Sequence, residues 1–264
     1  MIIDLKGKHA LVSGSTAGIG YAIAKGLAAA GAAVVINGRG EGRVKQAVLQ
    51  LQEEFPANRI DGVAADLSSA EGVAQLVARV PETDILVNNL GIFEPKAFEA
   101  TTDDDWQRFF DTNVMSGIRL TRHYLAHLKR RNWGRIVFVS SESAINIPSE
   151  MIHYGMTKTA ELAISRGVAE SLAGTGITVN AVLPGPTRSE GVGEFFAKIA
   201  REQGKSEEEV ERDFITTHRP TSLVRRLASV EEVASMVVYV CSPQASATTG
   251  AALRVDGGVV RSII

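Results

Sequence analysis

Short apolar runs alternate with longer stretches of helical periodicity along most of the chain. The short runs predict strands at 8–13, 33–37, 60–65, 84–88, 135–140, 177–183 and 251–255. The longer stretches predict helices near 18–30, 41–55, 69–79, 104–131, 154–173 and 229–241. Strands that are apolar on both faces and separated by helices form right-handed crossovers into a buried parallel sheet. We therefore expect one α/β domain over residues 1–264, with a doubly wound, Rossmann-like parallel sheet of about seven strands and helices on both faces.

Residues 188–226 interrupt this alternation. The segment is dense in charge, contains no predicted strand and carries short amphipathic stretches. An excursion of this length inside a compact domain is usually a functional lid or a disordered insert. Its helical periodicity favours a helical lid that covers the substrate.

Composition narrows the class of protein. A net charge of −2 and a pI near 6.2 provide no field that would attract nucleic acid or an acidic membrane. The single cysteine, Cys241, excludes an internal disulfide and a cysteine-only zinc site, and no cluster of His, Asp and Glu suggests a metal. The N-terminus lacks the pattern of a signal peptide, and no apolar run approaches the ~18 residues of a membrane span. These features predict a soluble cytoplasmic protein.

A glycine-rich turn, "SGSTAGIG", follows the first predicted strand directly and opens a helix. Its three glycines, Gly14, Gly18 and Gly20, would let the backbone turn tightly and approach a pyrophosphate at the helix N-terminus. The spacing differs from the commoner G-x-G-x-x-G fingerprint, and glycines also occur in loops for backbone freedom alone. The strand–turn–helix context nevertheless favours a dinucleotide site. No Gly-Lys-Ser/Thr ending follows, which argues against a P-loop.

A second motif, "HYGMTKTAEL", places Tyr154 and Lys158 four residues apart in a predicted helix. Residues at this spacing share a helix face, so a phenol and an ammonium would lie close together. Taken alone, the pair is more typical of a solvated surface than of a catalytic site.

Taken together, the motifs resemble those of the short-chain dehydrogenase/reductase family over essentially the whole chain. The family's Thr-Gly-x-x-x-Gly-Ile-Gly motif is matched with Ser13 in place of threonine, and its Asn-Asn-Ala-Gly motif appears as "NNLG", with Leu90 in place of alanine. Tyr154 lies 13 positions after Ser141, as the family pattern requires. The turn "PGPT" ends at Thr187, where the family holds the nicotinamide carboxamide.

The resemblance implies which residues form the site. The implied catalytic residues are Asn113, Ser141, Tyr154 and Lys158. The implied cofactor-binding residues are Gly14, Ser15, Gly18, Ile19, Gly20, Arg39, Asp66, Leu67, Asn89, Gly91, Tyr154, Lys158, Pro184, Gly185 and Thr187. His153, which points to another helix face, is interpreted as a bystander, and His218 as a solvated residue of the lid.

The end of the second strand indicates which nicotinamide cofactor is used. An acid there would bind the ribose 2′-hydroxyl of NAD, whereas an arginine accommodates the 2′-phosphate of NADP. This chain has Gly38 in the acid position, followed by Arg39, so NADP(H) is favoured over NAD(H). The alternatives are that Arg39 pairs with Glu41 on the surface, and that Ala17, where the family has its other basic site, weakens the preference.

The resemblance assigns acid–base chemistry to Tyr154 and polarisation of the substrate carbonyl to Ser141. A Lys158 ammonium about 4 Å away, at an effective dielectric near 20, would favour phenolate by ~4 kcal/mol and bring the pKa of Tyr154 near 7. Lys158 would also bond the nicotinamide ribose, and Asn113 would hold a water that links Lys158 to solvent.

The sequence therefore predicts an NADP(H)-dependent oxidoreductase that interconverts a small-molecule carbonyl and alcohol. A narrower alternative is a 3-oxoacyl-(acyl-carrier-protein) reductase, against which the long, acidic lid argues. A third is a non-catalytic protein that senses the NADP redox state, against which the intact catalytic set argues. Family resemblance also predicts a homo-oligomer, with a tetramer favoured. It does not predict which substrate enters, because variable loops read it.

Overall fold

The centre of the molecule is a seven-stranded sheet in which every neighbouring pair of strands is parallel. The structure, a computed structural model, describes residues 2–263 apart from the side chains of residues 194 and 195. The strand order is β3-β2-β1-β4-β5-β6-β9. The strands span His9–Val12 (β1), Ala33–Gly38 (β2), Ile60–Ala64 (β3), Ile85–Asn88 (β4), Gly134–Val139 (β5), Ile177–Pro184 (β6) and Ala252–Val255 (β9). The predicted doubly wound sheet is confirmed.

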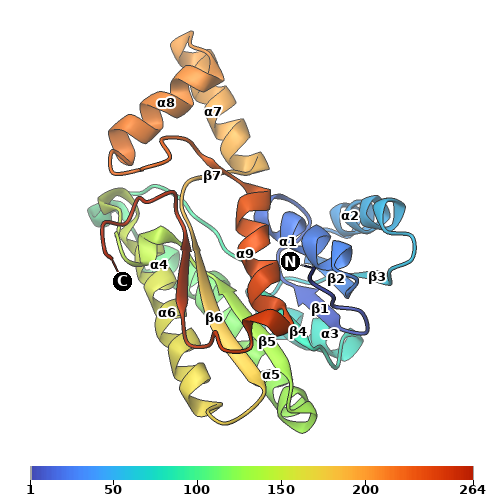
Figure 1. The fold of residues 1–264 in the computed structure, drawn as a ribbon. Helices are drawn as coiled ribbons and strands as arrows, with labels where there is room; N and C mark the ends of the chain where they lie inside the picture. The colour runs from blue at the N-terminus through green and yellow to red at the C-terminus, as the bar shows by residue number, and fades with distance from the viewer. Residues whose placement is uncertain (1, 264) are drawn as a thin grey trace.

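Helices cover both faces of this sheet (Figure 1). One face packs against α1 (Gly18–Ala29), α2 (Glu41–Glu54) and α9 (Val230–Cys241), and the other against α3 (Ala70–Arg79), α5 (Ser116–Arg131) and α6 (Ile152–Ser171). Alternate strand residues serve the two cores: Val137 and Val139 of β5 face the first, while Ile136 and Phe138 face the second. Both faces of the strands are therefore buried, as the continuous apolar runs require.

The predicted helix at 104–131 is not a single α-helix. It begins as α4 (Asp103–Phe109), capped by Thr102, passes through a π-helical turn at Phe110–Met115, and continues as α5. The basic residues at 129–131 do end the helix, where cations suit its dipole. A π-turn adds a residue to the helical repeat and re-aims the side chains within it, and it frequently occurs at functional sites.

The predicted lid forms a helical hairpin that projects beyond the end of β6 (Figure 1). It consists of α7 (Glu190–Gln203) and α8 (Glu207–His218), which pack on each other through a small apolar cluster of Phe196, Ala200, Val210, Ile215 and Leu227. The prediction of no strand at 188–226 is wrong at its first residue, because β7 (Thr187–Arg188) pairs with β8 (Ala228–Ser229) at the base of the hairpin. This pairing holds the chain that enters α7 beside the chain that leaves α8.

Short 3-10 helices complete the secondary structure at Phe98–Ala100, Glu142–Ala144, Ser149–Met151 and Pro243–Ala245. Within residues 2–263, no helix is both long and apolar enough to cross a lipid bilayer.

Candidate active site

Most of the predicted site residues lie at one edge of the sheet, because parallel strands present their carboxyl ends on the same side. The glycine turn follows β1, the "NNLG" segment follows β4, Ser141 follows β5 and Pro184 ends β6. These four strands are neighbours in the sheet, so segments far apart in sequence meet there.

The glycine turn is held by a set of hydrogen bonds from the segment after β4. The Ser13 hydroxyl accepts bonds from the backbone N–H groups of Asn89 (2.9 Å) and Leu90 (3.0 Å), and the Asn89 side-chain amide donates to the carbonyls of Ser13 and Gly14. Serine therefore has the hydroxyl that the turn needs where the family has threonine. Leu90 packs against the turn, and a Cβ on Gly14 would lie 3.1 Å from the Leu90 Cα.

The glycine positions of this turn have no room for larger side chains. Gly14 and Gly18 have φ values of +60° and +58°, in the left-handed region that favours glycine. A Cβ on Gly20 would lie 2.4 Å from both the Asn89 amide nitrogen and the Gly14 carbonyl oxygen. These are the features of a cradle for a pyrophosphate at the N-terminus of α1.

Asn37, at the end of β2, is a site-forming residue that the sequence motifs did not reveal. Its side-chain oxygen accepts a bond from Gly14 N–H, and its amide donates to the carbonyls of Val63 and Ala65. Ser15 joins the same network, since its hydroxyl donates to Val12 and accepts from Asn37 N–H. The sequence feature that could have revealed Asn37 is a polar residue in an otherwise apolar predicted strand, because a buried amide needs hydrogen-bond partners.

Arg39 and its neighbours form the next part of the edge. Arg39 is exposed and makes no ion pair within the described residues, so the alternative pairing with Glu41 is not found. A Cβ on Gly38, the residue before Arg39, would lie 2.6 Å from the Thr16 methyl group, which explains why this position is a glycine. Asp66 accepts hydrogen bonds from Ser68.

The remaining cofactor candidates lie around the same edge. Leu67 is buried and Ile19 packs partly buried against the core. Gly185 donates to the Val255 carbonyl and approaches Asp256 so closely that a Cβ would lie 2.7 Å from its carbonyl oxygen. The buried Thr187 hydroxyl donates to the Gly185 carbonyl (2.9 Å) and so closes this turn.

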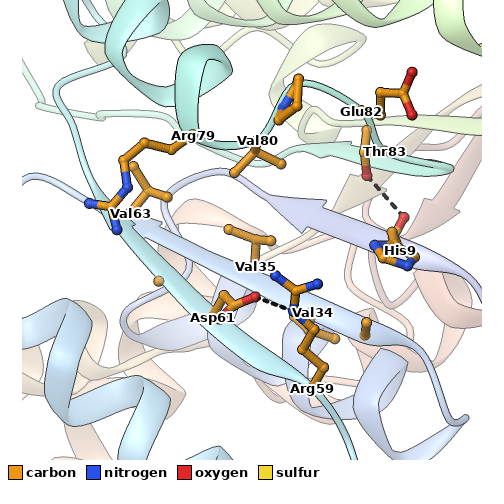
Figure 2. A pocket seen from close by; sticks show the side chains of 13 residues that line it. His9, Val34, Val35, Arg59, Asp61, Val63, Arg79, Val80, Glu82 and Thr83 are labelled. Atoms are coloured by element: carbon orange, nitrogen blue, oxygen red, sulfur yellow. Dashed lines mark hydrogen bonds and ion pairs between the residues drawn. The ribbon is translucent and has the colours of Figure 1, made fainter.

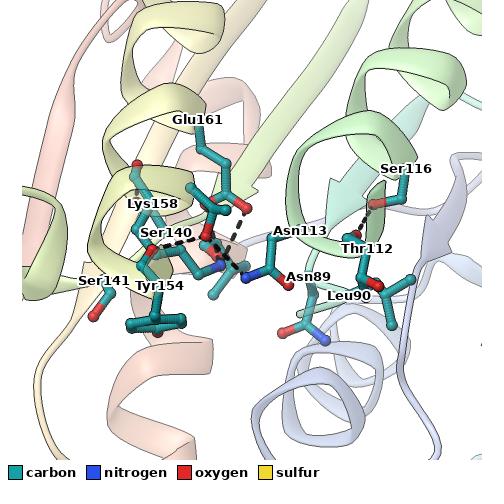
Figure 3. Close-up of polar contacts among 12 residues, drawn as sticks. Asn89, Leu90, Thr112, Asn113, Ser116, Ser140, Ser141, Tyr154, Lys158 and Glu161 are labelled. Atoms are coloured by element: carbon teal, nitrogen blue, oxygen red, sulfur yellow. Dashed lines mark hydrogen bonds and ion pairs between the residues drawn. The ribbon is translucent and has the colours of Figure 1, made fainter. Parts of the chain in front are cut away.

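Figure 3 shows Ser141, Tyr154, Lys158 and Asn113 gathered between β5, α6 and the π-turn. The Ser141 hydroxyl accepts a hydrogen bond from Ser143 N–H (3.1 Å) and lies near enough to the Tyr154 phenol to lower its pKa. Gly91 lies close to these side chains. A Cβ on Gly91 would be 3.3 Å from Lys158 Nζ and 3.6 Å from the Asn113 side-chain oxygen. The structure therefore brings the four predicted catalytic side chains together.

Asn113 is held by hydrogen bonds to Ile92 and Thr157, whereas the sequence analysis expects it to hold a water linked to Lys158. Its side-chain oxygen accepts from Ile92 N–H (2.8 Å), and its amide donates to the Ile92 carbonyl (3.0 Å) and the Thr157 hydroxyl (2.9 Å). The π-turn aims it toward the loop after β4. These bonds lock the loop that carries Gly91 against α6.

Lys158 binds a partner that the motifs did not predict. Its buried ammonium donates to both oxygens of Glu161, at 3.1 and 3.2 Å, and to the Val139 carbonyl at 3.0 Å. It lies 5.8 Å from the centre of the Tyr154 ring. The sequence signal for Glu161 was a carboxyl one turn after a lysine on a helix face of small residues.

The predicted fall in the pKa of Tyr154 is wrong for this structure. Burial raises the pKa of the phenol above its ordinary value, and Glu161 and Glu142 raise it further, while Lys158 and Ser141 lower it only in part. The prediction counted the ammonium but neither the desolvation of the phenolate nor the carboxylate that shares the ammonium.

A second buried ion pair joins the base of the hairpin to the active-site turn. Arg219, directly after α8, donates from Nε to Glu142 at 2.7 Å, and Glu142 follows Ser141 in the chain. Burial raises the pKa of Glu142 and Arg219 lowers it. The hairpin is thus anchored beside the predicted catalytic serine.

The two histidines of the sequence analysis stand apart from these contacts. His153 is buried, with its ring 4.2 Å from that of Phe109 (centre to centre), and burial lowers its pKa. His218 is exposed at the end of α8. Among residues 2–263, no group of three or more His, Cys, Asp and Glu side chains is arranged to hold a metal.

A hollow of about 400 Å³ lies elsewhere, toward the amino ends of β1 and β2 (Figure 2). Its lining includes His9, Val34, Arg59 and Thr83, and Arg59 pairs with Asp61 at 2.7 Å. It contains none of the predicted site residues.

Comparison with known proteins gives matches over the whole chain. A family model described as enoyl-(acyl carrier protein) reductase matches residues 14–260. The "uncharacterized oxidoreductase YvaG" of Bacillus subtilis is 48% identical, with 100% of both chains covered. The 3-oxoacyl-[acyl-carrier-protein] reductase FabG of Aquifex aeolicus is 32% identical and covers 98% of this chain and 100% of its own. The structure of L-sorbose reductase from Gluconobacter frateurii, complexed with NADPH and L-sorbose, has a TM-score of 0.95 at 30% identity, with 100% of both chains covered.

The crowding at Gly20 gives a test of the cradle. Gly20→Ala should displace Asn89 or Gly14, lower the free energy of unfolding by about 1–3 kcal/mol and weaken NADPH binding more than about tenfold. Chemical denaturation and fluorescence titration measure the two effects. Gly42→Ala is the matched control, because no atom lies within 4 Å of its added Cβ. Equal NADPH affinity in both variants would contradict the assignment.

Proposed function

The chain belongs to the short-chain dehydrogenase/reductase family, and we propose that it is an NADP(H)-dependent oxidoreductase that interconverts a carbonyl and an alcohol with Tyr154 as general acid–base. Membership establishes an NAD(P)-dependent dehydrogenase/reductase. The observation that carries the finer proposal is the meeting of Asn113, Ser141, Tyr154 and Lys158 at the carboxyl edge of the sheet.

The residues divide the chemistry between them. The glycine turn would hold the cofactor, and NADPH bound there would supply the hydride for the carbonyl carbon. Ser141 donates a hydrogen bond to the carbonyl oxygen as negative charge builds on it. The Tyr154 hydroxyl, which lies near Ser141, transfers its proton to that oxygen and gives the alcohol. In oxidation Tyr154 accepts the proton again.

The preference for NADP(H) rests on Arg39. Its guanidinium is exposed and unpaired at the end of β2, and it can fork onto a 2′-phosphate. No carboxylate occupies the adjacent Gly38 position, where an acid would repel that phosphate. The NADPH complex of L-sorbose reductase is in keeping with this choice.

We further propose that the hairpin over residues 188–226 is a substrate lid and that the substrate is a small polar ketone of the sugar type. The hairpin rises from the turn that carries Pro184 and Thr187, and the Arg219–Glu142 pair anchors the end of α8, at the base of the hairpin, beside Ser141. The likeness to L-sorbose reductase extends over the whole chain, hairpin included. A 3-oxoacyl thioester is the second candidate, favoured by the match to FabG.

Family resemblance also underlies two proposals about the environment of the protein: a homotetramer, which sedimentation as a monomer would contradict, and a cytoplasmic location. Neither affects the acid–base assignment.

Tyr154→Phe tests the acid–base. The variant should lose about 10²- to 10⁴-fold in turnover while keeping its NADPH affinity, because only the proton donor is removed. A panel of ketoses, simple ketones and a 3-oxoacyl thioester, followed by NADPH oxidation, measures both activity and substrate class. Tyr239→Phe, a hydroxyl removed from α9, should leave turnover unchanged. Binding of NADPH without oxidation of any substrate by the parent chain would favour the redox sensor.

Arg39→Asp tests the cofactor choice. It should weaken NADPH binding roughly 10- to 100-fold and change NADH binding far less, since only NADPH carries the 2′-phosphate. Lys45→Asp, which makes the same charge change at an exposed position of α2, should alter both affinities slightly and equally. Equal losses for the two cofactors in Arg39→Asp would refute the preference.

Closure of the lid can be followed by amide hydrogen exchange. We expect exchange in α7 and α8 to slow when NADPH and a substrate from the panel are added together, whereas exchange in α5, at the end of the molecule opposite the hairpin, serves as the control (Figure 1). Exchange in the hairpin that is unaffected by both ligands would contradict a lid.

A further inference from the structure

Glu161 is a buried carboxyl in direct contact with the proposed catalytic group. Tyr154, Lys158 and Glu161 follow one another at i, i+4 and i+7 of α6 and therefore share one face of the helix. Glu161 is 2% exposed and Lys158 is 3% exposed. The proposed reaction assigns no step to Glu161, although burying a second charge here is energetically costly.

The Lys158–Glu161 contact draws the ammonium toward the carboxylate. Lys158 Nζ lies 3.1 Å from Glu161 Oε1, 3.2 Å from Glu161 Oε2 and 3.0 Å from the Val139 carbonyl. The centre of the Tyr154 ring lies 5.8 Å from the same ammonium, so Glu161 and Val139, rather than the phenol, set the position of the charge (Figure 3).

The groups around Glu161 determine the pH at which its carboxyl becomes charged. Besides Lys158, the group that influences Glu161 is the Ser140 hydroxyl directly after β5, which donates to the Lys158 backbone carbonyl (2.9 Å) and lowers the pKa of Glu161. Burial raises the pKa of Glu161 to about 7, because these partners only partly offset desolvation. The carboxyl therefore changes charge in the neutral range.

Other charges also act on Tyr154. Glu142, from the 3-10 helix after β5, raises the pKa of the phenol as Glu161 does. Glu142 is paired with Arg219 and is itself influenced by Asp256, which follows β9. Glu161 differs from these groups because it contacts the ammonium that would otherwise stabilise the phenolate.

We propose that Glu161 is a positioning residue that holds the Lys158 ammonium away from Tyr154 and so keeps the phenol protonated, favouring carbonyl reduction over alcohol oxidation. The inference rests on the proposed function in that Tyr154 is the acid–base. Loss of the carboxylate charge frees the ammonium for the phenol, which then ionises more readily. The sign follows from the charges: a carboxylate beside Tyr154 disfavours phenolate, and its removal favours it.

Titration of the Tyr154 phenol in the ligand-free protein tests this directly. Phenolate absorbance is followed against pH in the parent chain and in Glu161→Gln, and each curve is corrected with the same chain carrying Tyr154→Phe. In Glu161→Gln the Tyr154 phenolate should appear about one pH unit lower or more. Glu170→Gln is the matched control, because Glu170 lies exposed on α6, paired with Arg166. It should leave the titration unchanged.

A second variant and a second readout separate the possible outcomes. Glu161→Asp keeps the charge on a shorter side chain, so it should shift the titration in the same direction by less, and it provides the test should Glu161→Gln fail to fold. On any substrate that the panel identifies, the reductase activity of Glu161→Gln should decline at a lower pH than that of the parent chain. A folded Glu161→Gln, or Glu161→Asp in its place, that titrates like the parent overturns the role of Glu161. Failure of the whole carbonyl panel overturns the proposed function and leaves the titration result standing.

Discussion

The parallel pairing of the central strands is the constraint on which the rest of the structure depends. Parallel strands end on one side, so β1, β4, β5 and β6 deliver the glycine turn, the "NNLG" segment, Ser141 and Pro184 to a single edge. Their last backbone groups would lack ladder partners there. Side chains such as Ser13, Asn37 and Asn89 supply the missing hydrogen bonds and thereby fix the shape of the edge. The shape of the proposed cofactor cradle is thus a consequence of how the sheet terminates.

Buried charge is the second feature that shapes the site. Two ion pairs, Lys158–Glu161 and Arg219–Glu142, lie behind and beside the phenol that the reaction requires. In a region of low dielectric, each carboxylate raises the cost of ionising Tyr154 and so opposes the effect of the lysine. The acidity of the phenol is therefore a property of the whole cluster, and the Tyr-x-x-x-Lys spacing sets only one part of it. The same cluster joins the helical hairpin to the turn that carries Ser141 through Arg219.

Hydrophobic periodicity predicts the strands of the sheet but not its irregular features. Periodicity located the strands of the sheet to within a few residues, because a strand buried on both faces must be apolar throughout. It missed the π-turn at 110–115, since one inserted residue barely disturbs a helical pattern. It also missed the pairing of β7 with β8, because two-residue strands have no period to detect.

The sequence by itself determined the fold class and the position of the glycine turn, and its resemblance to a known family named the residues that meet around Tyr154. The first two features depend on residue type and on spacing along one strand or helix, which the chain states directly. The tertiary structure alone decided that Asn37 fastens the turn, that Glu161 occupies the Lys158 ammonium, and that the pKa of Tyr154 is raised rather than lowered. Desolvation and charge pairing depend on which groups are buried together, and only the packing of β5, α6 and the segments around them establishes that.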